Sequence, residues 1–373
     1  IALELFDDMN QTKTLRHLSR LALLSTLSDD GMLTLASLGS CKYYTQRGEP
    51  LRPRRAMTPI LALTPPPTVV VDNGSLRPAA HIALRDTANA LRRLLLLAAD
   101  DGGGEVLAAS LRYSDAIEPA LLHGTPARNL TTTLRHLAAS GVTQVAVVPL
   151  LLAPSPSLRA AVDEALGGIH SDELPMRVAV GTCLVDDRVA DHELVVRALA
   201  HNILRTARAR RLAQPLRVAL VDHGTPSPRV NAVRTLLASK VAALLGERAL
   251  CVTGTSMERR DGPEYDFNEP LLENLLSTPP YCAGDVIIAM CFLLPGKHAG
   301  EGGDVEQILA EARARHSGLR THVCPLLAEQ PLVHQLLLHR AQLLHGQLSQ
   351  PSEHTSVCAS SGVLLLDDGV SKS

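Results

Sequence analysis

Short apolar runs alternate with amphipathic helical segments from Thr68 to about residue 348. Each run has the length of a strand, and Gly, Pro or Asn residues often mark its end. Such alternation is typical of a mostly parallel sheet that carries helices on both faces. The predicted strands are 68–74, 106–110, 143–152, 216–224, 249–256, 285–296 and 319–327. The predicted helices lie near 78–98, 130–139, 228–245, 268–276, 305–315 and in the segment that ends at 348.

Three sequence landmarks occur twice and in the same order, which indicates an internal repeat. They are VVVDNGSLRPAA and ALVDHGTPSPRV, offset by 150 residues; ASLRYSDAIEPALL and TSMERRDGPEYDFNEPLL, offset by 146; and VVPLLLAPSPS and AMCFLLPGKH, offset by 141. The falling offset indicates small deletions in the loops of the second copy. We therefore expect two homologous α/β domains, 66–211 and 213–348, which face each other across a cleft.

The segments outside the repeat differ from it in composition and in their pattern of apolar residues. Residues 1–65 combine a helix-like stretch with a basic, proline-containing segment that leads into a Thr-Pro-Pro-Pro run, and we expect an N-terminal extension and linker. Residues 349–373 are Ser-rich and show no period, so we expect a flexible tail.

Composition excludes several classes of partner. The 36 basic and 38 acidic residues leave a net charge of −2, too small a field to gather nucleic acid. The 7 cysteines form no CxxC pair, which indicates buried thiols in a reducing compartment. The richest apolar run, 286–294, has strand length and cannot cross a bilayer. We expect a soluble protein, cytoplasmic or in a plastid; the first residue is Ile1, so a targeting peptide is neither shown nor excluded.

Two histidines and a glutamate follow predicted strands of the second copy. His223 ends the strand 216–224, His298 follows the next-but-one strand and a turn, and Glu258 follows the strand between them. The carboxyl ends of parallel strands form the edge where open α/β sheets bind ligands, so the three side chains should meet there. Imidazoles with a carboxylate suit Fe(II), Co(II), Ni(II) or Zn(II), and the same groups accept protons near neutral pH. We predict His223, His298 and Glu258 as catalytic and metal-binding residues.

The first copy has lost all three of these groups. Asn73, Arg112 and Ser157 stand at the positions of the first histidine, the glutamate and the second histidine. Ordinary packing positions would not be expected to change as one chemically coherent set. The first copy is therefore predicted to be degenerate, and the second to hold the active site.

These residues carry a family resemblance. The segments VDHGTPSPRVNAVR and FLLPGKHAGEGGDVEQI resemble the two signature segments of the sirohydrochlorin chelatases, the ATP-independent class II chelatases of the CbiX type, in their long two-domain form. The resemblance extends over residues 66–348. It implies insertion of Co2+ or Fe2+, with Ni2+ also possible, into sirohydrochlorin in cobalamin or sirohaem biosynthesis. It also implies that His223 and His298 bind the metal and remove pyrrole protons, with help from Glu258.

Five further polar residues flank these motifs and are candidate contacts for the carboxylates of the tetrapyrrole. They are Arg229, Asn231, Arg259, Arg260 and Lys297. No organic cofactor is expected, because the string PGKHAG lacks the upstream Gly of a phosphate-binding loop and has His298 in place of Ser or Thr. The metal ion is therefore a substrate, and the fused copies predict a monomer that is an internal pseudo-dimer.

Two other functions compete with this interpretation. The string DHGT is similar to the RHG signature of histidine phosphatases, but Asp222 would repel a phosphate beside the histidine. The second alternative is a tetrapyrrole carrier that kept the fold and lost turnover. The complete set of two histidines and a glutamate in the second copy favours the enzyme.

Overall fold

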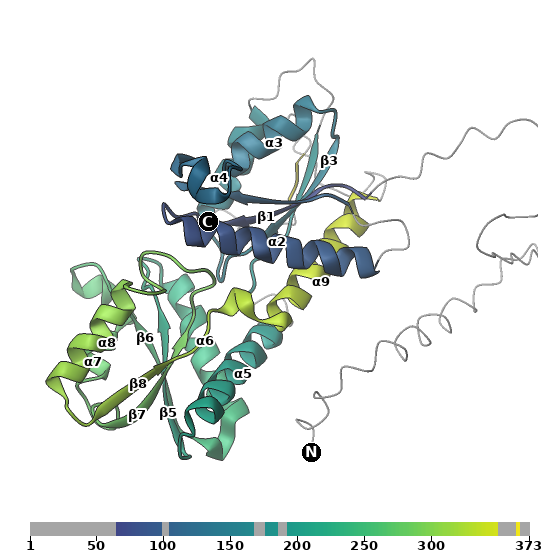
Figure 1. The fold of residues 1–373 in the computed structure, drawn as a ribbon. Helices are drawn as coiled ribbons and strands as arrows, with labels where there is room; N and C mark the ends of the chain where they lie inside the picture. The colour runs from purple at the N-terminus through teal and green to yellow at the C-terminus, as the bar shows by residue number, and fades with distance from the viewer. Residues whose placement is uncertain (1–64, 99–103, 168–175, 186–191, 350–362, 366–373) are drawn as a thin grey trace, which may run out of the picture. The chain divides into compact units, whose positions relative to one another are not determined.

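The computed structural model describes residues 65–98, 104–167, 176–185, 192–349 and 363–365 (Figure 1). The predicted extension 1–65 lies outside the described residues apart from Pro65. Of the predicted tail 349–373, the structure describes Ser349 and the short strand at 363–365.

Two parallel sheets form the framework (Figure 1). The first has the order β2-β1-β3-β4-β9 and consists of β1 (Thr68–Asp72), β2 (Val106–Ser110), β3 (Gln144–Pro149), β4 (Arg177–Val180) and β9 (Val363–Leu365). The second has the order β6-β5-β7-β8 and consists of β5 (Leu216–Asp222), β6 (Ala249–Ser256), β7 (Gly284–Met290) and β8 (Leu319–Val323). The fold class predicted from the alternation is confirmed.

Helices connect the strands, as parallel pairing requires. They are α2 (Pro78–Ala98), α3 (Leu130–Ala139), α4 (Pro156–Gly167), α5 (Glu193–Arg210), α6 (Pro228–Leu245), α7 (Leu272–Leu275), α8 (Asp304–Arg315) and α9 (Pro331–Leu348). Four elements, α4, β4, α5 and β9, were not among those predicted from the sequence, and β9 lies in the segment predicted as a flexible tail. The helix predicted near 268–276 is shorter in the structure: a 3-10 helix, Pro263–Asn268, precedes the single turn of α7. Pro270 lies between the two and has no amide hydrogen to continue a helix.

The two sheets share one pairing register. The equivalent pairs are Asp72 with Ser110 and Val71 with Pro149 in the first sheet, and Asp222 with Ser256 and Val221 with Met290 in the second. These pairs are separated by the offsets of 150, 146 and 141 residues that the sequence landmarks have. The backbone therefore places the residues compared above at equivalent positions of the two copies.

Each half of the chain is completed by the last helix of the other half. Helix α5 packs against α6 and β7 of the second half, whereas α9 packs against α2, β3 and β4 of the first (Figure 1). One buried apolar cluster includes Ile203 of α5 and Leu344 of α9 together with residues of both sheets. The predicted domain bounds 66–211 and 213–348 divide the chain by its order. Because α5 and α9 pack on the opposite half, these bounds stay a prediction.

Within the described part of the chain, no helix is both long enough and apolar enough to span a bilayer. The predicted monomer with an internal pseudo-dimer stays a prediction.

Candidate functional site

A pocket of about 860 Å³ lies at the carboxyl ends of the strands, and both halves of the chain line it. The first half contributes residues of the loops after β1, β2 and β3, and the second half contributes those after β5 and β7. His223 directly follows β5, and His298 lies in the loop between β7 and α8. The predicted convergence of the strand ends thus creates a concave site.

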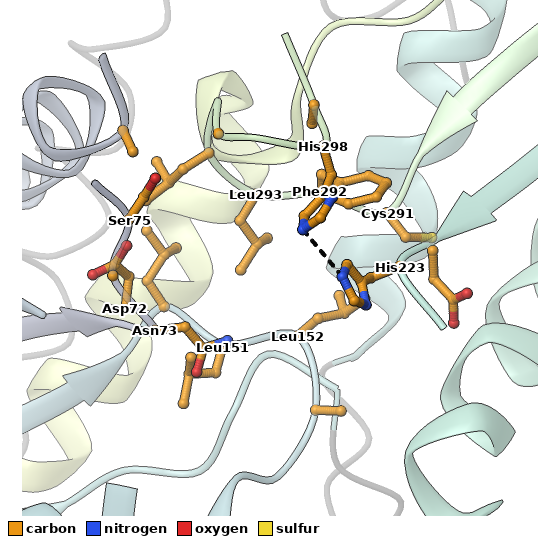
Figure 2. Close-up of a pocket in the computed structure, with 18 of the residues that line it drawn as sticks. Asp72, Asn73, Ser75, Leu151, Leu152, His223, Cys291, Phe292, Leu293 and His298 are labelled. Atoms are coloured by element: carbon orange, nitrogen blue, oxygen red, sulfur yellow. Dashed lines mark hydrogen bonds between the residues drawn. The ribbon is translucent and has the colours of Figure 1, made fainter. Parts of the chain in front are cut away.

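The two histidines meet in this pocket. Their Nε2 atoms are 3.1 Å apart, and their rings are 4.4 Å apart between centroids in an edge-on arrangement (Figure 2). The side chains of His223 and His298 are 46% and 27% exposed, so solvent and ligands can reach both. Two imidazoles that lie 75 residues apart in the sequence are thereby presented as one unit.

The outer ring nitrogens of this pair are already engaged. Nδ1 of His298 lies 2.7 Å from Oδ2 of Asp304, the first residue of α8, and Nδ1 of His223 lies 3.1 Å from the carbonyl oxygen of Gly224. Both acceptors favour the tautomer with the proton on Nδ1, which leaves the lone pair on Nε2. Two lone pairs face each other across 3.1 Å, an arrangement that a shared cation stabilises.

Glu258 is beside the histidine pair. Its Oε1 atom is 3.4 Å from Nε2 of His223, and its side chain is 58% exposed. Among the described residues, no group of three His, Cys, Asp or Glu side chains is close enough to hold a metal ion. The pair therefore offers two nitrogen ligands, with Glu258 next to only one of them.

A buried ionic network lies under the turn that carries His223. Oδ1 of Asp222 accepts hydrogen bonds from the amide of Gly224 (3.1 Å) and the hydroxyl of Ser256 (2.7 Å). Arg234 of α6, whose side chain is 5% exposed, places Nη1 3.8 Å from the same oxygen. Burial raises the pKa of the Asp222 carboxyl, whereas Ser256 and Arg234 oppose that shift. The network holds the end of β5 against β6 and α6.

Glycines allow the same close backbone approach in both copies. A Cβ atom on Gly224 would lie 1.9 Å from the carbonyl oxygen of Glu258, and one on Gly74 would lie 1.8 Å from that of Arg112. Both glycines have positive φ angles, 92° and 87°. Only glycine accommodates this contact, which fixes the backbone of Glu258 near His223.

The first half has the same backbone with different chemistry. Nη2 of Arg112 donates a hydrogen bond of 2.5 Å to the hydroxyl of Ser157, so these two residues contact each other where the second half places its glutamate and second histidine. Asn73 lines the pocket. Leu84 replaces the buried arginine at the 150-residue offset. The side chain of Asp72 therefore has no buried cation equivalent to Arg234.

This difference predicts that an Asp→Asn change has opposite effects on stability at the two positions at pH 8, although burial raises the pKa of both carboxyls. Burial raises the pKa of Asp72 from 3.8 to about 6, although Ser110 and the amide of Gly74 lower it. The folded state thus binds the proton more tightly than the unfolded state, and this contribution to stability is full below pH 3.8 and lost as pH rises through about 6. We expect Asp72→Asn to raise the free energy of unfolding at pH 8 by up to ~3 kcal/mol, with the gain shrinking towards pH 4.

Urea titrations at several pH values measure this effect. Asp222→Asn is the matched control, because it removes the partner of Arg234 and should destabilise the chain at pH 8. A gain for Asp72→Asn that does not change between pH 8 and pH 4 would contradict the assignment.

The five residues predicted to contact the carboxylates of the tetrapyrrole do not all lie at the pocket. Lys297, 72% exposed, lines the pocket and has Nζ 3.8 Å from Asp304. Asn231 is buried and contacts Asn268. The other three are not among the pocket-lining residues: Arg229 is exposed on α6, Arg259 is paired with Glu269 and Asp266, and Arg260 lies over the ring of Tyr265. The structure brings only Lys297 of these five to the pocket.

Two groups of site residues were not predicted from the sequence. Asp304 and Arg234 orient and support the histidine loops; an acid in the first turn of a predicted helix was the available signal for Asp304. The apolar walls are formed by Leu151 and Leu152 of the first half and Phe292 and Leu293 of the second (Figure 2). Such apolar residues look like ordinary strand ends in a sequence.

The model of the CbiX family matches residues 217–343. This segment contains both histidines and Glu258 and omits the first half. No curated protein matches the chain.

Solved structures of other proteins are similar to this chain. SirB from Bacillus subtilis with Fe3+ has 17% identity and a TM-score of 0.51, covering 76% of this chain and 98% of SirB. The sirohydrochlorin chelatase SirB from Bacillus subtilis subspecies spizizenii in complex with cobalt has 16% identity and a TM-score of 0.49, covering 76% and 97%. DR2241 from Deinococcus radiodurans, a multi-domain protein with structural similarity to chelatases, has 18% identity and a TM-score of 0.47, covering 74% and 54%. At 17% identity, the likeness to the first of these shows a shared fold.

Proposed function

We propose that this chain, whose residues 217–343 match the model of the CbiX family, inserts a divalent metal ion into a tetrapyrrole of the sirohydrochlorin type. The metal is a substrate, and no nucleotide takes part. The observation that carries the proposal is the pair of Nε2 atoms of His223 and His298, 3.1 Å apart in the pocket.

The spacing of the pair suits a borderline metal ion. Bonds of about 2.0–2.1 Å from one ion to both nitrogens would give an N–metal–N angle of about 95–102° at this separation of 3.1 Å. The pair is only a partial ligand set, so water and the incoming macrocycle would complete the coordination. Such an open site favours transfer of the ion, because an ion enclosed by four protein ligands would be released slowly.

The same side chains serve the proton balance. One divalent ion enters the macrocycle and two pyrrole N–H protons leave it. Once the ion has moved, the Nε2 lone pairs of His223 and His298 are free to accept protons, and the exposed carboxylate of Glu258 can pass protons to solvent. Asp304 holds the ring of His298 in place and stabilises its protonated form through the 2.7 Å contact.

The pocket is large enough for a macrocycle. Its volume of about 860 Å³ lies in the upper part of the range of roughly 300–1,000 Å³ for small-molecule sites. SirB from Bacillus subtilis, with the same fold, was solved with Fe3+. We propose Co2+ or Fe2+ as the metal, with Ni2+ as a further candidate, in cobalamin or sirohaem biosynthesis, and His223, His298 and Glu258 as the residues that carry the reaction.

A chelation assay tests the proposed function. Purified full chain is mixed with sirohydrochlorin and Co2+, Fe2+ or Ni2+ in parallel, and the absorbance change and the loss of fluorescence are followed through many turnovers. Catalytic metallation above the rate without protein is the expected result. If the chain binds sirohydrochlorin but shows no turnover with Co2+, Fe2+ and Ni2+ alike, the proposed enzymatic activity is contradicted and a carrier function is favoured.

A further inference from the structure

Three side chains of the first half stand out at the pocket. Leu76 and Tyr113 are 64% and 56% exposed, and Arg77 beside Leu76 is also exposed. All three line the pocket that holds the histidine pair. An exposed leucine, an exposed aromatic ring and a cation on one wall form an amphipathic surface.

The two loops that carry these residues are held together. The hydroxyl of Ser114 donates to the carbonyl oxygen of Ser75 (3.2 Å) and accepts from the amide of Ser75 (3.3 Å), and Ser114 is buried. Tyr113 has φ 68°, which is unfavourable for a side chain with a Cβ atom. The backbone thus keeps Tyr113 exposed at a conformational cost, as residues at ligand sites often are.

The guanidinium of Arg77 is available for a ligand. Within the described residues it makes no hydrogen bond or ion pair; only its backbone amide donates, to Ser75 Oγ. At the equivalent positions the second half has Ser227 for this arginine and Arg259 for Tyr113. The guanidinium of Arg259 is occupied by Glu269 at 3.0 Å. The combination of ring and available cation is therefore particular to the first half.

We infer that the first half, which lacks the histidines, is the substrate-recognition half: Arg77 pairs with a peripheral carboxylate of the macrocycle while Tyr113 and Leu76 contact its flat face. This inference rests on the proposed function for the identity of the macrocycle. A guanidinium binds a carboxylate in a bidentate manner, and an aromatic ring packs on a conjugated plane. Contacts on this wall would leave the pyrrole nitrogens facing His223 and His298.

Binding and rate measurements with two variants test the inference. Arg77→Gln and Tyr113→Ala should each raise the Kd of sirohydrochlorin, measured by fluorescence titration without metal, roughly tenfold, as loss of one charged or stacking contact does. The KM for sirohydrochlorin should rise in parallel, with the loss falling on KM rather than kcat. Tyr113→Phe keeps the aromatic ring, so its Kd for sirohydrochlorin should stay close to that of the unaltered chain. The affinity for Co2+ alone should not change.

Matched controls separate recognition from general damage. Arg92→Gln removes an exposed arginine of α2 that does not line the pocket, and Leu121→Ala removes a leucine that is 56% exposed elsewhere; both should bind sirohydrochlorin as the unaltered chain does. Unchanged Kd and KM in Arg77→Gln and Tyr113→Ala, in a chain that metallates, would overturn the inference and leave the proposed function standing. Binding that depends on Arg77 without any metallation would overturn the proposed function alone.

Discussion

Replacement of His223 or His298 by Ala should lower the rate of metal insertion by about 10²- to 10⁴-fold, the usual cost of losing a positioned proton acceptor. Each substitution leaves one imidazole where two Nε2 atoms lie 3.1 Å apart, so the shared ion loses a ligand as well. Initial rates with sirohydrochlorin and Co2+ measure the loss. Both side chains are partly exposed, so thermal melts should stay close to that of the unaltered chain.

The first half supplies the matched control variants. Asn73→Ala and Ser157→Ala change the equivalent positions, where an amide and a hydroxyl cannot take up a proton near neutral pH. Ser157→Ala also removes the acceptor of the Arg112 hydrogen bond, which is an exposed contact. Both variants should metallate at nearly the unaltered rate. Equal losses in the two halves would mean that the first half also takes part in the chemistry.

Arg234→Met should cause the largest loss of stability, about 3–5 kcal/mol, because it leaves the carboxylate of Asp222, which is only 16% exposed, without its cation. The same side chain donates to the carbonyl oxygens of Asn268 (3.0 Å) and Phe267 (3.1 Å) and to Ser256. These acceptors would lose their partners in a site that water reaches poorly. Urea titration gives the free energy of unfolding, and differential scanning calorimetry should show a fall in Tm of roughly 10 °C.

Arg229→Met on the same helix is the control, because Arg229 is exposed and its removal should change stability by no more than about 0.5 kcal/mol. The double variant with Asp222→Asn removes the unpaired charge and should recover part of the loss. Equal stability of Arg234→Met and Arg229→Met would show that the buried pair contributes little. The rate of metal insertion by folded Arg234→Met would then show whether the turn that carries His223 keeps its geometry without the arginine.

Some of the site could be read from local pattern. The histidines and Glu258 follow apolar runs of strand length, and parallel strands bring such positions to one edge of a sheet whatever the helices between them do. Comparison of the two copies also identified Asn73, Arg112 and Ser157 as their counterparts, and the shared register of the sheets agrees with those offsets. The side chains that orient the pair were missed, because Asp304 and Arg234 are ordinary helix residues until a loop folds onto them.

The alternation of apolar runs with amphipathic helices was sufficient to predict two parallel sheets, since strand burial and helix amphipathicity are local properties of the chain. Tertiary structure decided which helix covers which sheet: α5 packs on the second half and α9 on the first, each opposite to its place in the chain. It also decided that Asn231 is buried with Asn268 while Leu76, Arg77 and Tyr113 reach the pocket. Exposure depends on contacts between residues distant in sequence, and no local period encodes those contacts.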